Sequence, residues 1–261
     1  MSSEDASTPA PVAILFATGK GQRAVHTVED EDRLRAGFTG SYASQSAGTI
    51  GGAFMQVLED VHVLTVGQVV ENMEAGVVLA VSHKVESARQ KGMSHEYLQV
   101  PEAVGKSLQN NWTEALHGSK VALILMVGQY AHARPLYGTE TDPGIGSESL
   151  LLKSALEHAG FQTTLVPQAD LQDVSGMRAA LAAFAERASS CDTSVIIASG
   201  HGIQLLQEQA FDGVRLLAGD FKSGCGLEQT LTFNEIRMAA TARKANLVLY
   251  GACREDATPF M

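Results

Sequence analysis

The chain has 261 residues, of which 45% are hydrophobic and 18% are charged, as is ordinary for a globular protein of one or two domains. Its formal net charge of −10 at pH 7 makes nucleic acid and anionic membrane surfaces unfavourable partners. No apolar run approaches the roughly 20 residues that a membrane-spanning helix needs, so we expect a soluble, cytoplasmic protein without a membrane partner.

The N-terminal third of the sequence contains one clear strand. Residues 1–11 are rich in Ser, Pro and acidic residues and lack the basic and apolar segments of a signal peptide, so we expect a disordered tail. An apolar run at 12–17 predicts a buried strand. The pattern further on predicts a helical turn at 53–59, an amphipathic segment at 65–75, a helix at 77–90 and a strand at 95–100.

A new pattern begins after a polar stretch at 101–119, which is typical of a linker with one helical turn. From residue 120 onward, apolar strands alternate with amphipathic helices. We expect strands at 121–127, 161–166, 195–198, 216–217 and from 246 towards Cys253, and helices at 147–160, 173–188 and 232–242. This alternation predicts an α/β fold with a mostly parallel central sheet and helices on both faces.

Two of these strands end at reactive residue types. The runs 194–198 and 247–250 are apolar without alternation, which is typical of buried parallel strands, and small-residue turns with His201 and Cys253 follow them. The carboxyl ends of parallel strands form the crevice where ligands bind, so we expect the two side chains to meet there if the strands are neighbours. His201 would act as general base and Cys253 as nucleophile, while the turn at Gly202 and the N–H of Cys253 would face an oxyanion.

The cysteines bear on the same question. Cys191, Cys225 and Cys253 are an odd number at spacings that match neither a disulfide framework nor a zinc site, which favours a reducing compartment. Taken singly, Cys253 could be a small buried hydrophobic residue and His201 a turn residue. Their positions after two predicted core strands favour a chemical role.

The residues around the histidine and the cysteine resemble the caspase-like cysteine peptidases of clan CD. Ser199-Gly200-His201-Gly202 and Gly251-Ala252-Cys253-Arg254 resemble the two catalytic motifs of that family, in which the histidine precedes the cysteine by about 50 residues. The segments 211–213, 216–220 and 159–161 resemble neighbouring pieces of the family. The resemblance therefore implies a p20-like catalytic region at 120–261 and a caspase-like (caspase-hemoglobinase) fold.

The front of the chain resembles the small subunit of the same family. Residues 16–24 resemble the opening of a p10 subunit, and Gly37-Phe38-Thr39 resembles its phenylalanine-threonine motif. We therefore expect a p10-like region at 12–100 and a linker at 101–119, with both regions forming one caspase-like domain. A p10-like region before a p20-like region is the arrangement of type III metacaspases.

The resemblance implies a monomeric endopeptidase that cleaves proteins or peptides after Arg or Lys through an acyl-enzyme, with calcium stimulation and no organic cofactor. A cationic P1 side chain needs an acidic partner in its pocket. Glu148 aligns with the family's acid at the start of the first long helix, and Asp142 lies nearby. Gly251 stands where metacaspases usually carry Asp and caspases carry Gln. Glu148 is equally compatible with an ordinary acid in the first turn of a helix.

Calcium would require hard oxygen ligands near the site. Four loop carboxylates could supply them, and the first two match family positions best: Asp212, Asp220, Glu255 and Asp256. Each is also compatible with an ordinary solvated loop carboxylate. Activation by self-cleavage would need a basic residue in an exposed loop, for which Lys106, Lys120 and Lys222 qualify.

Three other functions compete with a peptidase. Residues 19–24 match the dinucleotide-binding pattern G-x-G-x-x-A, but no apolar-faced helix follows and no second strand ends in an acid about 20 residues on. A caspase-like scaffold or pseudoenzyme acting by protein binding is the main alternative. Another thiol hydrolase or transferase is the third.

Overall fold

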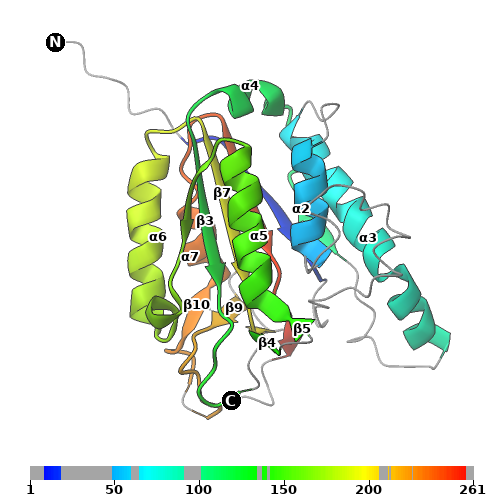
Figure 1. The fold of residues 1–261 in the computed structure, drawn as a ribbon, viewed down its shortest axis with the longest axis vertical. Helices are drawn as coiled ribbons and strands as arrows, with labels where there is room; N and C mark the ends of the chain where they lie inside the picture. Colours follow the sequence, from blue (N-terminus) through cyan, green and yellow to red (C-terminus); the bar gives the residue numbers. More distant parts are fainter. Residues whose placement is uncertain are drawn as a thin grey trace.

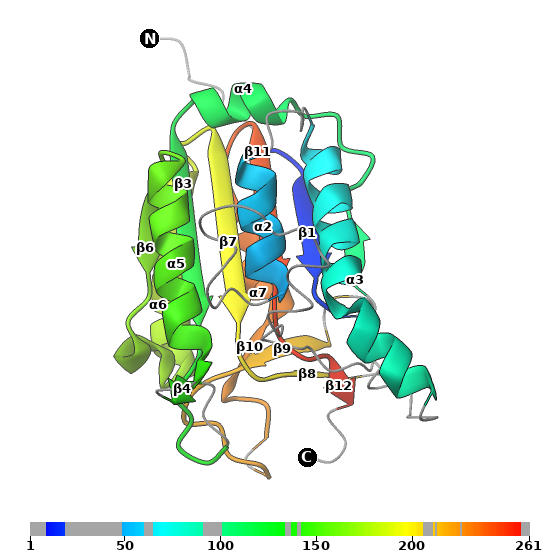
Figure 2. The same cartoon turned by 45° about the vertical axis from the view of Figure 1, so that its right-hand side comes forward.

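A six-stranded sheet forms the centre of the molecule in the computed structural model, with strand order β2-β1-β11-β7-β3-β6 (Figure 1, Figure 2). The structure describes residues 9–18, 49–59, 65–90, 101–133, 137–139, 142–205, 211, 213–224 and 226–256. The strands of this sheet are β1 (Val12–Phe16), β2 (Glu102–Val104), β3 (Lys120–Met126), β6 (Gln162–Leu165), β7 (Thr193–Ser199) and β11 (Ala245–Tyr250). All neighbours are parallel except β1 and β2.

A smaller sheet lies at the carboxyl end of the central strands, in the lower part of Figure 2. Its order is β10-β9-β8-β12, and a separate pair joins β4 to β5. These strands are β4 (Tyr137–Thr139), β5 (Asp142–Pro143), β8 (Gly202–Gln204), β9 (Val214–Leu217), β10 (Thr230–Thr232) and β12 (Glu255–Asp256). The residues that follow β7 and β11 therefore pass directly into the small sheet.

Helices cover both faces of the central sheet (Figure 2). The helices on one face are α2 (Thr49–Glu59), α3 (Val66–Gln90) and α5 (Gly144–His158). The other face carries α6 (Val174–Ala188) and α7 (Phe233–Met238), while α4 (Trp112–His117) lies at the amino end of the strands and η2 (Gln168–Leu171) is a single 3₁₀ turn. The expected α/β architecture is confirmed.

Alternation along the strands separates two hydrophobic cores. Leu247 and Leu249 of β11 pack with α2, α3 and α5, whereas Val248 and Tyr250 pack with α6 and α7. Successive side chains of a strand point to opposite faces, so a strand that is covered on both sides must be apolar throughout. This explains the uninterrupted apolar runs of β7 and β11, which are buried along their whole length.

The expected strands and helices of the C-terminal half are present with small shifts at their ends. Asp173 caps α6 by accepting a hydrogen bond from the N–H of Gly176, and Thr232 and Glu235 form a capping box at the start of α7. Helix α7 ends at Met238 rather than near 242. The reason is that Asn246 of β11 binds both the N–H and the carbonyl of Ala242 and draws that segment to the sheet.

Several expectations for the N-terminal half differ from the structure. The segments 65–75 and 77–90 form one helix, α3, in which Gly76 allows close contact with Ala53 of α2 instead of breaking the helix. The stretch 101–119, expected to be a linker with one helical turn, contains the helix α4 and also the strand β2. Trp112 of α4 is almost fully buried. The sequence did not indicate this burial, because the neighbouring residues are polar. The strand expected at 95–100 lies outside the described residues.

The tail is held at its C-terminal end. Residues 1–8 lie outside the described part, but Ala10 is buried. Its N–H donates to the carbonyl of Ala242 and its carbonyl accepts from Asn246. The prediction of disorder through residue 11 is therefore wrong at Ala10, because the buried side chain of Asn246 donates a hydrogen bond to the Ala10 backbone. None of the helices in the described residues has the length and apolar character needed to cross a bilayer.

Asn246→Ala should destabilise the fold by about 2–4 kcal/mol, because it leaves buried partners in three segments without hydrogen bonds. The side-chain amide of Asn246 forms hydrogen bonds with Ser194, Ala242 and Ala10 at the same time. Asn110→Ala is the matched control, since its amide donates to a single exposed carbonyl, that of Lys244. Chemical denaturation measures both. Equal losses would contradict the role of Asn246 as the link between the tail and the sheet.

Candidate active site

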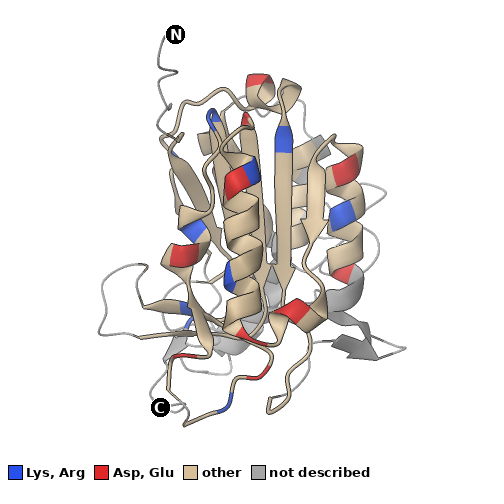
Figure 3. Ribbon diagram, turned by 90° about the vertical axis from the view of Figure 1, so that its left-hand side faces the viewer, with Lys and Arg blue, Asp and Glu red and all other residues tan. Residues whose placement is uncertain are grey.

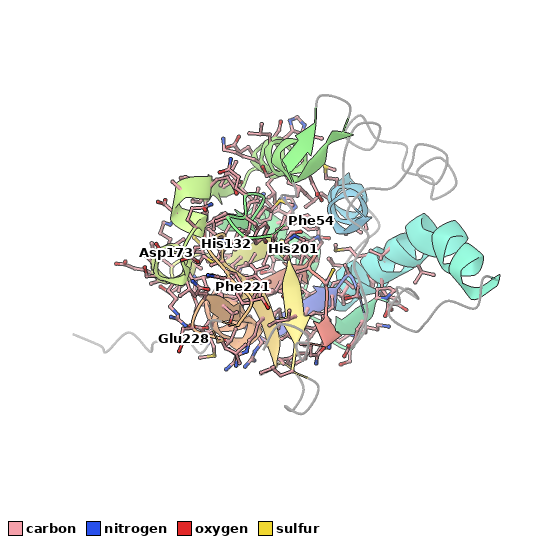
Figure 4. The ribbon with its side chains drawn as sticks, turned by 90° about the horizontal axis from the view of Figure 1, so that it is seen from below. Phe54, His132, Asp173, His201, Phe221 and Glu228 are labelled. Atoms are coloured by element: carbon pink, nitrogen blue, oxygen red, sulfur yellow. The ribbon has the colours of Figure 1, made fainter. Side chains whose placement is uncertain are left out.

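His201 and Cys253 follow neighbouring strands and lie at the same edge of the sheet. Strand β11 pairs with β7 in parallel over six residues, from Ala245 opposite Thr193 to Tyr250 opposite Ala198. After each strand, the backbone leaves the sheet and reaches the reactive residue within a few positions. Viewed from this edge, His201 lies near the centre of the molecule (Figure 4). The strand adjacency on which the sequence prediction depended is confirmed.

The two turns are joined by backbone contacts. The N–H of Gly251 donates to the carbonyl of Ala198 at 2.8 Å, and the hydroxyl of Ser199 donates to the carbonyl of Gly251 at 3.2 Å. Gly202 packs so closely that a Cβ added there would lie 2.4 Å from the carbonyl oxygen of Cys253. The residue after the histidine therefore touches the backbone of the cysteine. Both reactive side chains are half-buried.

Gly200 is fixed by backbone conformation and by its neighbours. Its φ of +151° lies in the region that favours glycine. A Cβ at this position would lie 2.6 Å from the hydroxyl of Tyr130 and 3.2 Å from the carbonyl oxygen of Val127. The histidine turn is therefore built around a glycine because a tyrosine occupies the adjacent space.

Tyr130, on the loop after β3, is the residue that fills this space. Its hydroxyl accepts a hydrogen bond of 2.7 Å from the backbone N–H of His201, and the two rings lie 4.5 Å apart between centroids. Burial raises the pKa of Tyr130, so the phenol stays protonated at neutral pH. A negative charge on Cys253 acts in the same direction, which places the thiol within electrostatic reach of the phenol.

Arg254 is a buried cation directly after the candidate nucleophile. Its guanidinium is 3.1 Å from the carbonyl oxygen of Thr18, 2.9 Å from Oε1 of Gln204 and 2.5 Å from Oε2 of Glu102. It also stacks over the ring of Phe16, 4.4 Å from the centroid. A buried charge is tolerated only when it is paired and hydrogen-bonded, and β1, β2 and β8 together satisfy Arg254.

The candidate S1 residues occupy different environments. Glu148 is 3% exposed and faces α2, where a Cβ at Gly51 would lie 2.5 Å from its carboxylate. Helix α5 begins at Gly144, three residues earlier than expected, so Glu148 lies in its second turn and is not an ordinary first-turn acid. Asp142 lies in the short strand β5, and nothing is described of its side chain. Gly251 lies in the cysteine turn and is buried.

The candidate calcium ligands are only partly described. Asp220 follows β9, and its Oδ1 atom is buried without a hydrogen-bond partner. Asp212 lies outside the described residues, and the side chains of Glu255 and Asp256 in β12 are also outside them. Among the described residues, no group of three His, Cys, Asp or Glu side chains could hold a metal ion. The orphaned oxygen of Asp220 is thus the one described feature here that suits a hard cation.

The three candidate self-cleavage lysines differ in accessibility. Lys120 lies in β3, and its ammonium donates to the carbonyls of Leu116 and Ala159. Lys106 forms an ion pair with Glu74 of α3. Lys222 lies in an exposed stretch between β9 and β10. Lys106 and Lys222 therefore both lie in exposed loops, whereas Lys120 lies in a strand.

Sequence reasoning missed the contact of Tyr130 with His201 and the tertiary partners of Arg254. Tyr130 lies in the loop after an apolar strand and carries no motif of its own, so only the fold shows that it reaches His201. Arg254 was visible in the sequence as part of the cysteine motif, but its partners Glu102 and Thr18 are more than a hundred residues away. Pairing of β1 beside β11 brings those partners to the site.

Comparison with known families identifies the chain. The family model of the caspase domain, peptidase C14, matches residues 119–259, more than half of the 261 residues. The chain belongs to the caspase domain family. This places it among the cysteine peptidases, and the six-stranded, mostly parallel sheet with flanking helices is consistent with the caspase-like fold. A comparison with curated protein sequences gave no match.

Gly200→Ala should destabilise the caspase domain by more than about 2 kcal/mol, because it adds a collision to an unfavourable φ. Gly224→Ala is the matched control: its φ is +83°, but nothing lies within 4 Å of an added Cβ. The control should cost only about 1 kcal/mol. Thermal and chemical denaturation of the two variants measure the difference. A smaller loss at Gly200 than at Gly224 would contradict the close packing against Tyr130.

Arg254→Met should cost about 2–3 kcal/mol, because it keeps the apolar contact with Phe16 but leaves three acceptors without their donor. Glu102→Gln should cost less than about 1 kcal/mol, since this side chain is 45% exposed and keeps an acceptor oxygen. Denaturation at equal protein concentration compares the two. If Glu102→Gln is as damaging as Arg254→Met, the ion pair itself holds this turn, contrary to our expectation.

Proposed function

We propose that the protein is a cysteine endopeptidase that uses His201 and Cys253, cleaves after Arg or Lys and is stimulated by calcium. The observation that carries the proposal is the parallel pairing of β7 and β11, which ends both strands at one edge with the histidine after one and the cysteine after the other. Membership in a cysteine peptidase family supports the same chemistry. The resemblance of residues 16–24 and 37–39 to a p10 subunit, ahead of the catalytic region, is the support for a type III metacaspase.

The proposed reaction proceeds in two stages. His201 removes the proton of the Cys253 thiol, and the sulfur attacks the carbonyl carbon of the scissile peptide bond. The negative oxygen of the tetrahedral intermediate would be stabilised by the N–H of Cys253 at the turn that Gly202 contacts. His201 then gives its proton to the leaving amine as the C–N bond breaks. In the second stage a water molecule, activated by His201, hydrolyses the thioester and restores the thiol.

Preference for a cationic P1 side chain rests on acidic groups. Helix α5 starts near the carboxyl edge of the sheet and carries the buried carboxylate of Glu148 in its second turn. Figure 3 shows further acidic positions in the loops at this edge, and the net charge of −10 favours cationic peptides over anionic ones. Asp142 lies in β5, directly before α5, and is the second candidate for the acidic partner of the P1 side chain.

Calcium stimulation is proposed on narrower grounds. The orphaned Oδ1 atom of Asp220 would gain a partner from a bound cation. Asp212 is eight residues before it in the sequence, and Glu255 and Asp256 lie in β12 of the same small sheet, two strands away from β9. A bound calcium ion would offset the negative charge of these carboxylates. The covalent chemistry described above requires only His201 and Cys253.

Hydrolysis of matched fluorogenic peptides with Arg, Lys or Asp at P1 tests the proposal, with and without millimolar calcium. We expect cleavage after Arg and Lys, stimulated by calcium, and a loss of at least about a thousandfold in Cys253→Ala and His201→Ala. Asp220→Asn should weaken the calcium response and leave the P1 preference unchanged. Cys191→Ala is the control for the thiol, because Cys191 lies at the opposite end of β7.

A scaffold or pseudoenzyme within the same family is the second candidate, and Gly251 favours it. That position carries an acid or an amide in active relatives of the two kinds that the motif resembles, and a glycine supplies neither. Folded protein that cleaves none of the three peptides, in calcium or without it, would favour the scaffold. Cleavage after Asp would retain the peptidase but overturn the basic P1 preference.

A further inference from the structure

We propose that Tyr130 is a positioning residue for His201, holding both its backbone and its ring so that the imidazole faces the thiol of Cys253. The inference rests on the proposed His201–Cys253 chemistry and adds a residue that neither the sequence motifs nor the family match assigns a role. Tyr130 touches no reacting atom in this role. Its effect on the reaction passes through the orientation of His201.

Two separate contacts join Tyr130 to the histidine. The hydroxyl accepts the backbone N–H of His201 at 2.7 Å, and the ring lies 4.5 Å from the imidazole with an angle of 52° between the planes. The first contact fixes where the histidine leaves the turn, and the second limits rotation of its side chain. The flanking glycines have no side chains with which to restrain the imidazole, so the contacts with Tyr130 supply a restraint that the glycines cannot.

Tyr130 can serve as a fixed support because its own loop is tied down. The side chain of Gln168 accepts from the N–H of Gly128 and donates to the carbonyl of Met126, which binds the loop on one side. On the other side, the N–H of Ala131 donates to the carbonyl of Gly219 at 2.8 Å. Tyr130 is 9% exposed, so its hydroxyl meets His201 in a largely desolvated position where a hydrogen bond is strong.

The phenol acts as a neutral group. Burial raises the pKa of Tyr130, and a nearby thiolate at Cys253 would raise it further, so the hydroxyl does not ionise in the pH range of a histidine-dependent enzyme. A neutral acceptor orients its partner without adding a charge that would compete with the thiolate for the imidazolium. A protonated phenol is not a general base, which is consistent with a positioning role for Tyr130.

A second buried tyrosine provides the matched comparison. The hydroxyl of Tyr250 donates to the carbonyl of Arg215 at 2.9 Å, and its pKa is also raised by burial and by Cys253. Tyr130→Phe and Tyr250→Phe therefore each remove one buried hydroxyl near the cysteine. Only the first removes a hydrogen bond to the backbone of His201.

The test measures the rate at which iodoacetamide alkylates Cys253 as a function of pH, with peptide mass spectrometry to separate it from Cys191 and Cys225. We expect Tyr130→Phe to move the alkylation midpoint to higher pH and to slow peptide cleavage roughly tenfold in kcat with little change in KM. Tyr130→Leu, which also removes the ring, should be more severe. His132→Ala should leave the alkylation profile and kcat of the parent protein unchanged. This control would show that the exposed His132, labelled at the same edge in Figure 4, does not act on Cys253.

The outcomes separate this inference from the proposed function. A shifted alkylation profile in Tyr130→Phe but not in Tyr250→Phe supports positioning, even if no test peptide is cleaved. An unchanged profile and kcat in folded Tyr130→Phe would overturn the inference while leaving the peptidase intact. Equal shifts in the two tyrosine variants would also overturn it, since they would reflect loss of any buried hydroxyl near the cysteine.

Discussion

The parallel pairing of β11 between β7 and β1 is the constraint on which the site depends. β11 aligns with β7 over six residues and with β1 over five, and it contributes alternate side chains to two cores. A slip of one residue would exchange Leu247 and Leu249 with Val248 and Tyr250 between those cores. Core packing on both faces therefore fixes the register. The register in turn fixes where Cys253 leaves the sheet relative to His201.

The N-terminal segment is part of this arrangement although the family model begins at residue 119. β1 is an interior strand, and it brings Phe16 and Thr18 to the buried guanidinium of Arg254. Glu102 reaches the same group from β2. Two of the three hydrogen-bond acceptors of Arg254, and the ring over which it stacks, thus come from chain outside the matched region, while Gln204 within it supplies the third acceptor. Loss of that segment would leave a buried cation uncompensated, which is among the most destabilising changes a core can suffer.

Much of the architecture could be predicted because the strands carry a strong local signal. The apolar runs that became β1, β3, β7 and β11 are unambiguous when both faces of a strand are covered. The short strand β2 could not be found, because it is a three-residue edge strand. A helical turn was expected within residues 101–119, but the sequence indicated neither the bounds of α4 nor the burial of its tryptophan. Their stability comes from tertiary contacts that leave no periodicity in the sequence.

The same distinction applies to the site. His201 and Cys253 could be named because each follows a recognisable strand and each lies in a motif. Tyr130 could not, because its role depends on β3 lying beside β7, which brings the loop after one strand against the turn after the other. The residues proposed for a P1 pocket and for calcium binding stay predictions. The candidate acids lie in loops, in short strands and in α5, and their surroundings depend on how those segments pack at the edge of the sheet.

The most direct measurement of the central claim is to locate the adduct formed by a peptidyl ketone electrophile with Arg at P1, using mass spectrometry of the intact and digested protein. If the pairing of β7 and β11 joins His201 to Cys253, one adduct should form at Cys253, and His201→Ala should abolish it without unfolding the protein. Modification spread over Cys191, Cys225 and Cys253, or unaffected by loss of His201, would contradict it.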